Sequence, residues 1–215
     1  MPMTLEITVT VGVPPEKLPK TMAQPADLQT NPRDIDAAPS RGADEPGALP
    51  ADPALAAWLG TSGSLTRRLR RLCGADFALE VVTEGHEPAS PEDQALLGTR
   101  EPSLFVRRVR LCAGRQSLVH ACTFVPSLTL RRHPRLAELG ASPLWEALAD
   151  REGVRRTGFQ FARVGGGPRD GGRLPETPDV DAGLWGRRSL FLIDEDPLLV
   201  YEFFRPALAD FGLPE

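Results

Sequence analysis

Two stretches of the chain each read as a pair of β-strands joined by a short turn, and this feature restricts the fold more than any other. The first pair covers 103–113 and 117–126, and the second covers 187–194 and 198–206. All four runs contain several large apolar residues, and only three residues separate the two strands of each pair. Connections this short join antiparallel neighbours. The chain is therefore expected to form at least two β-hairpins.

Further segments complete a single-domain pattern. Strands are expected at 77–85 and 154–164, and short helices at 53–59, 64–73, 90–97 and in a stretch with Pro134 near its start that reopens at Pro143. Few helices lie between successive strands, which disfavours parallel pairing through crossover helices. The expected fold class is α+β, with one domain built from a roughly six-stranded antiparallel sheet and short flanking helices.

The first quarter of the chain differs in composition from the rest. Ten of the 22 prolines lie in residues 1–53, and 14–53 holds almost no large apolar residue. Such a segment cannot bury enough apolar surface to offset its chain entropy. We expect a disordered, proline-rich leader at 1–48 and a folded domain at 49–212. Within the leader, the period-2 pattern of 4–13 fits either an added edge strand or an unpaired tail.

Composition and charge argue against several classes of protein. A formal net charge of −4 disfavours a protein whose main partner is a nucleic acid. No apolar run approaches the roughly 20 residues of a membrane span, and the start lacks the basic and apolar regions of a secretory signal. The three cysteines have no CxxC spacing and the three histidines are scattered, so we expect neither a metal site nor a disulfide framework. These features fit a cytoplasmic protein.

Two charged residues stand out on otherwise apolar strand faces. Arg107 shares its face of the run 103–113 with apolar residues, and Glu202 does the same in 198–206. A charge on an apolar face is costly unless it has a partner. Either the two residues pair with each other, or their faces are solvated, or they line a closed pocket with a cation for an anionic ligand at one end and an acid at the other.

Other features favour structural roles. His120 lies on a strand with Leu118 and Cys122, and is more typical of a hydrogen-bonded core histidine than of a catalyst. The arginines of 64–73 are more typical of a solvated helix face than of a nucleic-acid patch. The glycine run 165–167 does not open a helix, which argues against a phosphate-binding loop.

The C-terminal run DAGLWGRRSLFLIDEDPLLVYEFFRPAL (181–208) resembles the signature of the chorismate pyruvate-lyase family, and its start, Asp181–Arg188, is the most specific part. Shorter blocks agree in order and spacing, namely Trp58-Leu59, Gly63-Ser64-Leu65-Thr66-Arg67-Arg68, Val82-Thr83-Glu84-Gly85, Phe105-Val106-Arg107-Arg108, Leu111-Cys112-Ala113, Thr123-Phe124-Val125-Pro126, Leu139-Gly140 and Ser142-Pro143-Leu144. The similarity spans residues 50–209, nearly the whole expected domain.

This resemblance implies an internal ligand pocket and a lyase that removes pyruvate from chorismate to give 4-hydroxybenzoate, the first step of ubiquinone biosynthesis. It implies no metal and no organic cofactor. The implied partners are the small-molecule substrate and a product that the pocket retains, giving product inhibition, with no nucleic acid, no membrane span and a monomeric protein.

The resemblance also assigns site residues. Arg107 falls on the arginine that holds the ring carboxylate, and Glu202 on the carboxylate at the 4-hydroxyl end, where either acid or base chemistry is open. We expect an apolar pocket to raise the pKa of Glu202. Leu144 matches a position whose backbone contacts the ligand carboxylate, and Leu65 matches an apolar flap residue. Cys122 stands where the family has an arginine, so no anion contact is expected there.

An alternative of another class remains open. The effector domains of some bacterial transcription regulators are similar in fold, and a pocket with one arginine and one glutamate would also serve a non-catalytic small-molecule sensor. Such regulators carry an N-terminal winged helix, whereas residues 1–53 contain no helix-turn-helix pattern. The enzyme is the favoured reading.

Overall fold

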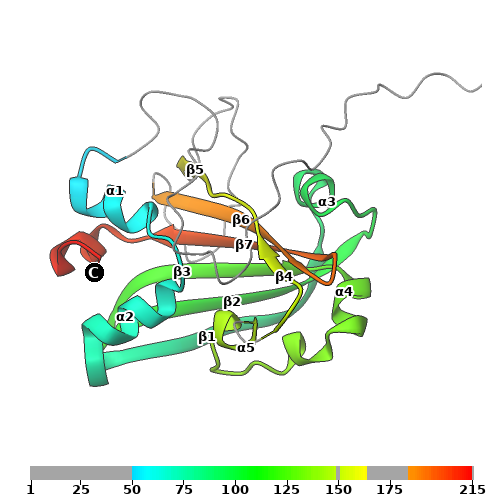
Figure 1. Ribbon diagram of the computed structural model, residues 1–215, viewed down its shortest axis with the longest axis horizontal. Helices are drawn as coiled ribbons and strands as arrows, with labels where there is room; N and C mark the ends of the chain where they lie inside the picture. Colours follow the sequence, from blue (N-terminus) through cyan, green and yellow to red (C-terminus); the bar gives the residue numbers. More distant parts are fainter. Residues whose placement is uncertain (1–49, 149–150, 164–183, 215) are drawn as a thin grey trace, which may run out of the picture.

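The computed structural model describes residues 50–148, 151–163 and 184–214, and these form an antiparallel sheet of seven strands with short helices on its faces (Figure 1). The strands are β1 (Phe77–Pro88), β2 (Ser103–Ala113), β3 (Gln116–Val125), β4 (Val154–Arg156), β5 (Gln160–Arg163), β6 (Trp185–Ile193) and β7 (Asp196–Phe204). Their order is β1-β2-β3-β7-β6-β4, and β5 also pairs with β6. The expected α+β class is confirmed.

Both predicted hairpins are present, as β2–β3 and β6–β7. They meet at the centre of the sheet, where β3 pairs antiparallel with β7. The turn of the second hairpin lies earlier than predicted. Asp194 and Glu195 have φ values of 50° and 71°, as in the tight turns that match the twist of paired strands, so Asp196 already belongs to β7.

The single strand predicted at 154–164 is wrong in detail, because the segment forms two strands. β4 pairs with the end of β6 and β5 with its start. Between them the chain leaves the ladder, and Thr157 holds the corner: its N–H donates to the Leu190 carbonyl at 2.9 Å, and its Oγ1 accepts from the Leu190 N–H at 3.0 Å. The break turns Phe159 into the interior, where it is buried.

The helices begin at the capping residues that their sequences offer. The helices and 3-10 turns are α1 (Pro53–Leu59), α2 (Leu65–Cys73), η2 (Gly74–Asp76), α3 (Pro91–Leu97), α4 (Ser127–Arg132), η3 (Pro134–Ala137), α5 (Leu144–Leu148) and η4 (Pro206–Phe211). The side chains of Asp52, Ser64 and Ser90 accept first-turn N–H groups of α1, α2 and α3. The helical stretch expected after residue 126 is divided by prolines into α4, η3 and α5.

The two faces of the sheet have separate cores. One, here called the pocket face, carries residues of β2, β3, β6 and β7, including Phe105, Val109, Val125, Phe191 and Val200, and is covered by α1, α2, η3 and α5. The opposite face is covered by α3 and carries Leu104, Val106, Cys122, Phe124, Leu199, Tyr201 and Phe203. Figure 1 shows α1, α2 and α5 on the near side of the sheet.

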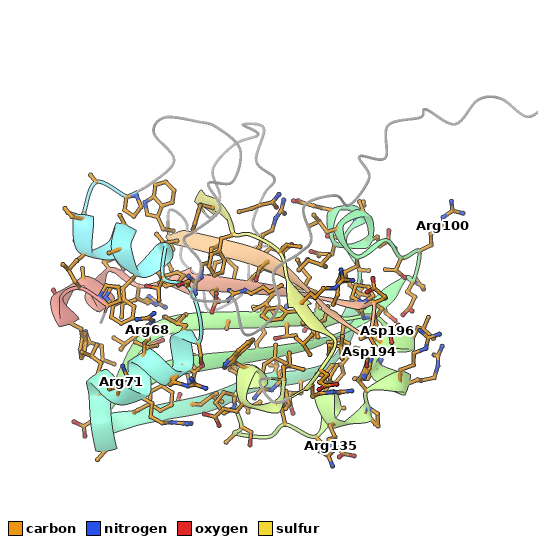
Figure 2. The ribbon with its side chains drawn as sticks, in the orientation of Figure 1. Arg68, Arg71, Arg100, Arg135, Asp194 and Asp196 are labelled. Atoms are coloured by element: carbon orange, nitrogen blue, oxygen red, sulfur yellow. The ribbon has the colours of Figure 1, made fainter. Side chains whose placement is uncertain are left out.

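Three of the four arginines of α2 lie on a solvent-exposed face. Arg67, Arg70 and Arg71 are exposed, and Arg70 pairs with Glu146 of α5. Figure 2 shows Arg71 at the outside of the molecule.

Several predictions fall on other parts of the chain. The leader at 1–48, its possible strand at 4–13, the glycine run 165–167 and residues 181–183 lie outside the described residues. Within the described ranges, no helix is both long and apolar enough to cross a membrane.

Candidate active site

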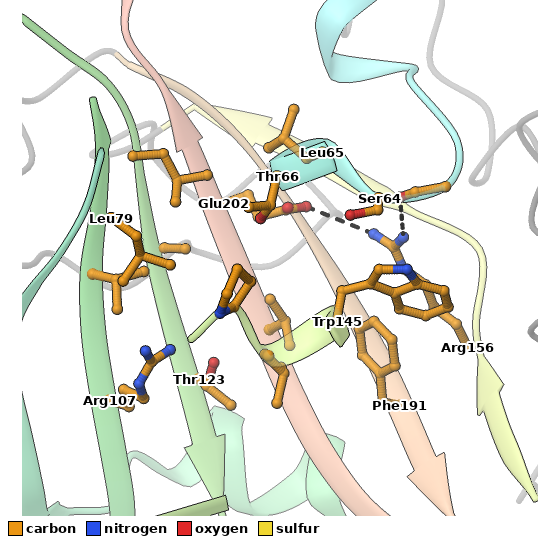
Figure 3. Close-up of a pocket in the computed structure, with 17 residues that line it drawn as sticks. Ser64, Leu65, Thr66, Leu79, Arg107, Thr123, Trp145, Arg156, Phe191 and Glu202 are labelled. Atoms are coloured by element: carbon orange, nitrogen blue, oxygen red, sulfur yellow. Dashed lines mark hydrogen bonds and ion pairs between the residues drawn. The ribbon is translucent and has the colours of Figure 1, made fainter. Parts of the chain in front are cut away.

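A pocket on the pocket face gathers all four residues assigned from the sequence, Leu65, Arg107, Leu144 and Glu202 (Figure 3). The first turn of α2 and the start of α5 border it on the helix side, and β1, β2, β3, β4, β6 and β7 form its floor. Its remaining lining residues are Gly63, Ser64, Thr66, Leu79, Val109, Leu111, Ala121, Thr123, Pro143, Trp145, Arg156, Phe191 and Val200. Most of this lining is apolar, and its charges come from Arg107, Arg156 and Glu202.

Arg107 is buried on β2 and fixed from two sides. Its Nε donates to Oε1 of Glu84 at 2.8 Å, and its Nη2 donates to the carbonyls of Gly140 and Ser142 at 2.6 and 3.1 Å. Glu84 is its direct cross-strand neighbour on β1. Burial lowers the pKa of Arg107, and Glu84 opposes that shift. Nη1 has no acceptor within the described ranges, which leaves this end of the guanidinium to a ligand.

Glu202 lies on β7 beside two guanidiniums. Its Oε2 accepts from Arg187 Nε at 2.6 Å, and Arg156 Nη2 lies 3.6 Å away. Arg187 is fully buried, and its Nη1 donates to two carbonyls between α1 and α2. The Arg187 guanidinium carbon lies 3.9 Å from the ring centroid of Phe159 and 5.2 Å from that of Phe204. The Arg187 guanidinium that binds the Glu202 carboxylate is therefore itself fixed in place by packing against these two rings.

The expectation that an apolar pocket raises the pKa of Glu202 is wrong. Burial does raise it, but the charges of Arg187 and Arg156 and the hydrogen bond from Arg187 outweigh burial and lower the pKa below its usual value. Glu202 is consequently a carboxylate at neutral pH.

Arg107 and Glu202 do not pair with each other. They share the pocket face, but β3 lies between their strands, so they are about 10 Å apart across the sheet. Along the strand direction they are offset by two residues. Their faces are not solvated either, because the Arg107 and Glu202 side chains are only 3% and 14% exposed, and each has a charged partner, Glu84 or Arg187. The pair therefore stands at two separate ends of one pocket.

Known proteins with similar sequences identify the family of this chain. The family profile described as chorismate lyase matches residues 45–210. The chain belongs to the chorismate lyase family. A protein of Methylococcus capsulatus named probable chorismate pyruvate-lyase is 40% identical over 163 residues, which cover 70% of this chain and 94% of that protein. One of the same name from Thiobacillus denitrificans is 37% identical over 166 residues, covering 76% of this chain and 88% of that protein.

Among solved structures, this member of the chorismate lyase family is similar to the C-terminal domain of the histidine utilization repressor from Pseudomonas syringae. That likeness has a TM-score of 0.44 and 13% identity, and covers 61% of this chain and 92% of the other.

Position 122, where an arginine was expected from the family, does not face the pocket. Cys122 is buried on the opposite face, packed in the apolar cluster there and in contact with Arg108. Neighbouring positions on a strand point to opposite faces, so Thr123 lines the pocket and residue 122 cannot. The cysteine therefore removes no ligand contact from this pocket.

Sequence reasoning missed Arg156 and Arg187. Arg187 carried a usable signal, because it shares a strand face with Ser189, Phe191 and Ile193, the same pattern of one charge among mostly apolar residues that marked Glu202. Arg156 ends a three-residue strand, which is too short to show an alternation.

Two further observations concern His120 and clusters of possible metal ligands among the described residues. His120 is buried, with Nε2 3.0 Å from Ser117 Oγ, as expected for a hydrogen-bonded core histidine. No group of three or more histidine, cysteine, aspartate or glutamate side chains able to hold a metal ion occurs in the described part of the chain.

Proposed function

We propose that this protein is a chorismate pyruvate-lyase that converts chorismate to 4-hydroxybenzoate and pyruvate, the first step of ubiquinone biosynthesis. The observation that carries the proposal is the placement of Arg107 and Glu202 at two ends of one largely apolar pocket. Relatives at 37–40% identity bear the name of this activity. Aromatisation of the ring drives the reaction, so the protein needs no metal or organic cofactor for it. In this proposal the protein acts as a monomer in the cytoplasm.

Binding follows from the ends of the pocket. Arg107 binds the ring carboxylate, because a guanidinium forms strong charge-assisted hydrogen bonds with a carboxylate. The backbone of Leu144 provides a second contact to that group, and Leu65 packs on the ring. Glu202 accepts a hydrogen bond from the 4-hydroxyl. The product keeps the ring carboxylate and the hydroxyl, so the same contacts retain 4-hydroxybenzoate after the reaction and inhibit turnover.

The charge state of Glu202 favours base chemistry. With its pKa below the usual value, the group accepts a proton at neutral pH and has none to donate. It removes the C4 proton, and the C4–H electron pair forms the new ring double bond as the bond between C3 and the ether oxygen breaks. The leaving enolate takes a proton from water at its methylene carbon and becomes pyruvate, and Glu202 returns the C4 proton to the solvent. Chorismate is thereby divided into 4-hydroxybenzoate and pyruvate with no atom gained or lost.

The test is incubation of the purified full-length protein with chorismate while pyruvate and 4-hydroxybenzoate are followed. Arg107→Gln should weaken binding of both substrate and product, by about 2–5 kcal/mol for a truncated buried charge pair. Glu202→Gln should lower turnover by roughly 10²–10⁴ while product binding changes less.

Each variant also removes a partner from another charge, Glu84 or Arg187, so thermal unfolding must show that both remain folded. Binding of chorismate by the unmodified protein without release of pyruvate would contradict the lyase and favour the small-molecule sensor.

A further inference from the structure

The Glu202 end of the pocket holds more positive than negative charge. Arg156, Arg187 and Glu202 meet there, two cations with one carboxylate, which leaves one net positive charge. Glu202 Oε2 lies 2.6 Å from Arg187 Nε, a hydrogen-bond distance. Arg156 Nη2 lies 3.6 Å from the same oxygen, beyond hydrogen-bond length. Arg156 therefore has the longer and weaker of the two ion pairs that Glu202 makes.

Arg156 also has unused hydrogen-bond donors. Its Nε donates to Ser189 Oγ at 3.1 Å and its Nη1 to the Gly63 carbonyl at 3.4 Å. A guanidinium has five N–H donors, so three remain without an acceptor in the part of the chain that the structure describes. The side chain is only 10% exposed and lines the pocket. Burial lowers the pKa of Arg156 to about 9, opposed by Glu202 and reinforced by Arg187, so the group is still a cation at neutral pH.

The guanidinium is held in one orientation. Its central carbon lies 4.0 Å from the ring centroid of Phe159 and 5.1 Å from that of Phe191. The first turn of α2 also lines the pocket through Ser64, Leu65 and Thr66, and a helix N-terminus favours negative charge nearby. Figure 3 shows Arg156 and Arg107 on opposite sides of the pocket, and the Arg156 guanidinium reaches Glu202, whose strand is two places from that of Arg107 in the sheet. Two anionic groups of one ligand could therefore be held apart.

We propose that Arg156 binds the enolpyruvyl carboxylate of chorismate, so that each of the two substrate carboxylates lies on its own guanidinium. The inference rests on the proposed function, in which Arg107 takes the ring carboxylate. Chorismate is a dianion, and the pocket lining presents two arginines and one glutamate. With Arg107 on the ring carboxylate, Arg156 is available for the second carboxylate. Arg187 does not compete for this role, because it is fully buried behind Glu202.

This assignment gives Arg156 a part in the reaction as well as in binding. As the bond between C3 and the ether oxygen breaks, the electron pair moves onto the leaving fragment, which already carries the enolpyruvyl carboxylate. The charge next to Arg156 is therefore greater in the transition state than in bound chorismate, and a fixed cation stabilises the transition state more. Glu202 remains bound to Arg187 and keeps its role as the base.

The product separates this role from a structural one. 4-Hydroxybenzoate has lost the enolpyruvyl group, so its binding should not depend on Arg156. If Arg156 acted only through Glu202 or through the fold, 4-hydroxybenzoate binding would change together with chorismate binding, because both ligands place their 4-hydroxyl at Glu202.

The experiment compares four full-length proteins: the unmodified chain, Arg156→Met, Arg156→Lys and Arg155→Met. Methionine keeps an apolar stem against Phe159 and Phe191, and lysine keeps the charge. Arg155 is the matched control, an arginine on the same strand that pairs with Glu195 at the surface. For each protein, the dissociation constants of chorismate and 4-hydroxybenzoate and the single-turnover rate with chorismate are measured.

Arg156→Met should lower the second-order rate with chorismate by about 10²–10³, while the Kd of 4-hydroxybenzoate stays within threefold. Arg156→Lys should recover part of the loss, and Arg155→Met should change neither ligand. Equal losses for chorismate and 4-hydroxybenzoate, or no loss for chorismate, would overturn the assignment.

Failure of the proposed function gives a different result. A protein that binds chorismate without cleaving it refutes the lyase, yet the ratio of the two dissociation constants still tests Arg156. A protein that binds neither ligand refutes both.

Discussion

Glu202 keeps its negative charge because two arginines outweigh its burial, and this sets the pH dependence of the site. Its pKa lies below the ordinary value of 4.5, so its ion pair with Arg187 contributes stability that is present above that value and is lost as the pH falls through the lower, folded-state pKa. We expect the acid limb of kcat/KM to lie below pH 4.5, with no inflection from Glu202 between pH 5 and 8. A pH–rate profile checks this, and an acid limb between pH 6 and 7 would show that Glu202 has the raised pKa of a buried acid.

Glu84 orients Arg107. Replacing Glu84 should therefore weaken ligand binding, although Glu84 itself does not contact the ligand. Glu84→Gln replaces a charge-assisted bond by a neutral one, so the Kd of 4-hydroxybenzoate should rise about 3- to 30-fold. The matched control is Glu87→Gln, because Glu87 pairs with Arg108 on the opposite face of the same two strands. Isothermal titration of both variants checks the prediction, and equal effects at the two positions would contradict a positioning role for Glu84.

At the level of elements, α3 is fixed to the opposite face of the sheet by a buried hydrogen bond. The hydroxyl of Tyr201 on β7 donates to Asp93 Oδ1 at 2.6 Å, and Ser90 Oγ donates to the other carboxylate oxygen at 2.6 Å. Burial and Asp93 raise the pKa of Tyr201, so the hydroxyl keeps its proton. This contact stabilises the fold at a distance from the pocket.

Tyr201→Phe should therefore reduce stability without altering the site. It leaves a buried carboxylate oxygen without its donor, which costs about 1–3 kcal/mol, or roughly 2–4 °C in Tm per kcal/mol for a chain of this size. The Kd of 4-hydroxybenzoate should stay unchanged. Thermal unfolding and titration of the same sample test both parts, and weakened product binding would show that the two faces are coupled.

The helices and strands differ in how well they could be predicted from the sequence. The hairpins and helices were predictable because alternation, turns and caps are local signals, as at Ser64 and Ser90. The break between β4 and β5 was not, because it depends on where each piece pairs with β6. Arg156 was missed for the same reason, since its place in the pocket follows from that pairing.

On the scale of the whole molecule, the pocket depends on the contact between the two hairpins. Arg107 and Glu202 were predicted separately from their strand faces, but only the β3–β7 pairing places them two strands apart on one face. No local pattern specifies that pairing between segments far apart in the sequence. Arg187 faces Glu202 within the predicted β6–β7 hairpin, and the pKa of Glu202 was predicted in the wrong direction because this cross-strand partner was overlooked.

The leader at 1–48 is expected to be dispensable for catalysis. Its proline spacing and lack of apolar residues give it little to pack with. Deleting residues 1–47 should leave chorismate turnover within about threefold, a change of under roughly 1 kcal/mol in the barrier. Circular dichroism and turnover of the truncated chain check this. Loss of folding would show instead that the strand pattern at 4–13 docks on the sheet.

The central claim, that this pocket divides chorismate, is tested most directly by a single-turnover experiment. The protein is mixed in excess over chorismate and quenched at successive times, so that retention of 4-hydroxybenzoate cannot hide the chemical step. The account predicts one equivalent each of pyruvate and 4-hydroxybenzoate, formed at the same rate, and a rate reduced by roughly 10²–10⁴ in Glu202→Gln. Chorismate recovered intact from a folded, chorismate-bound protein would contradict it.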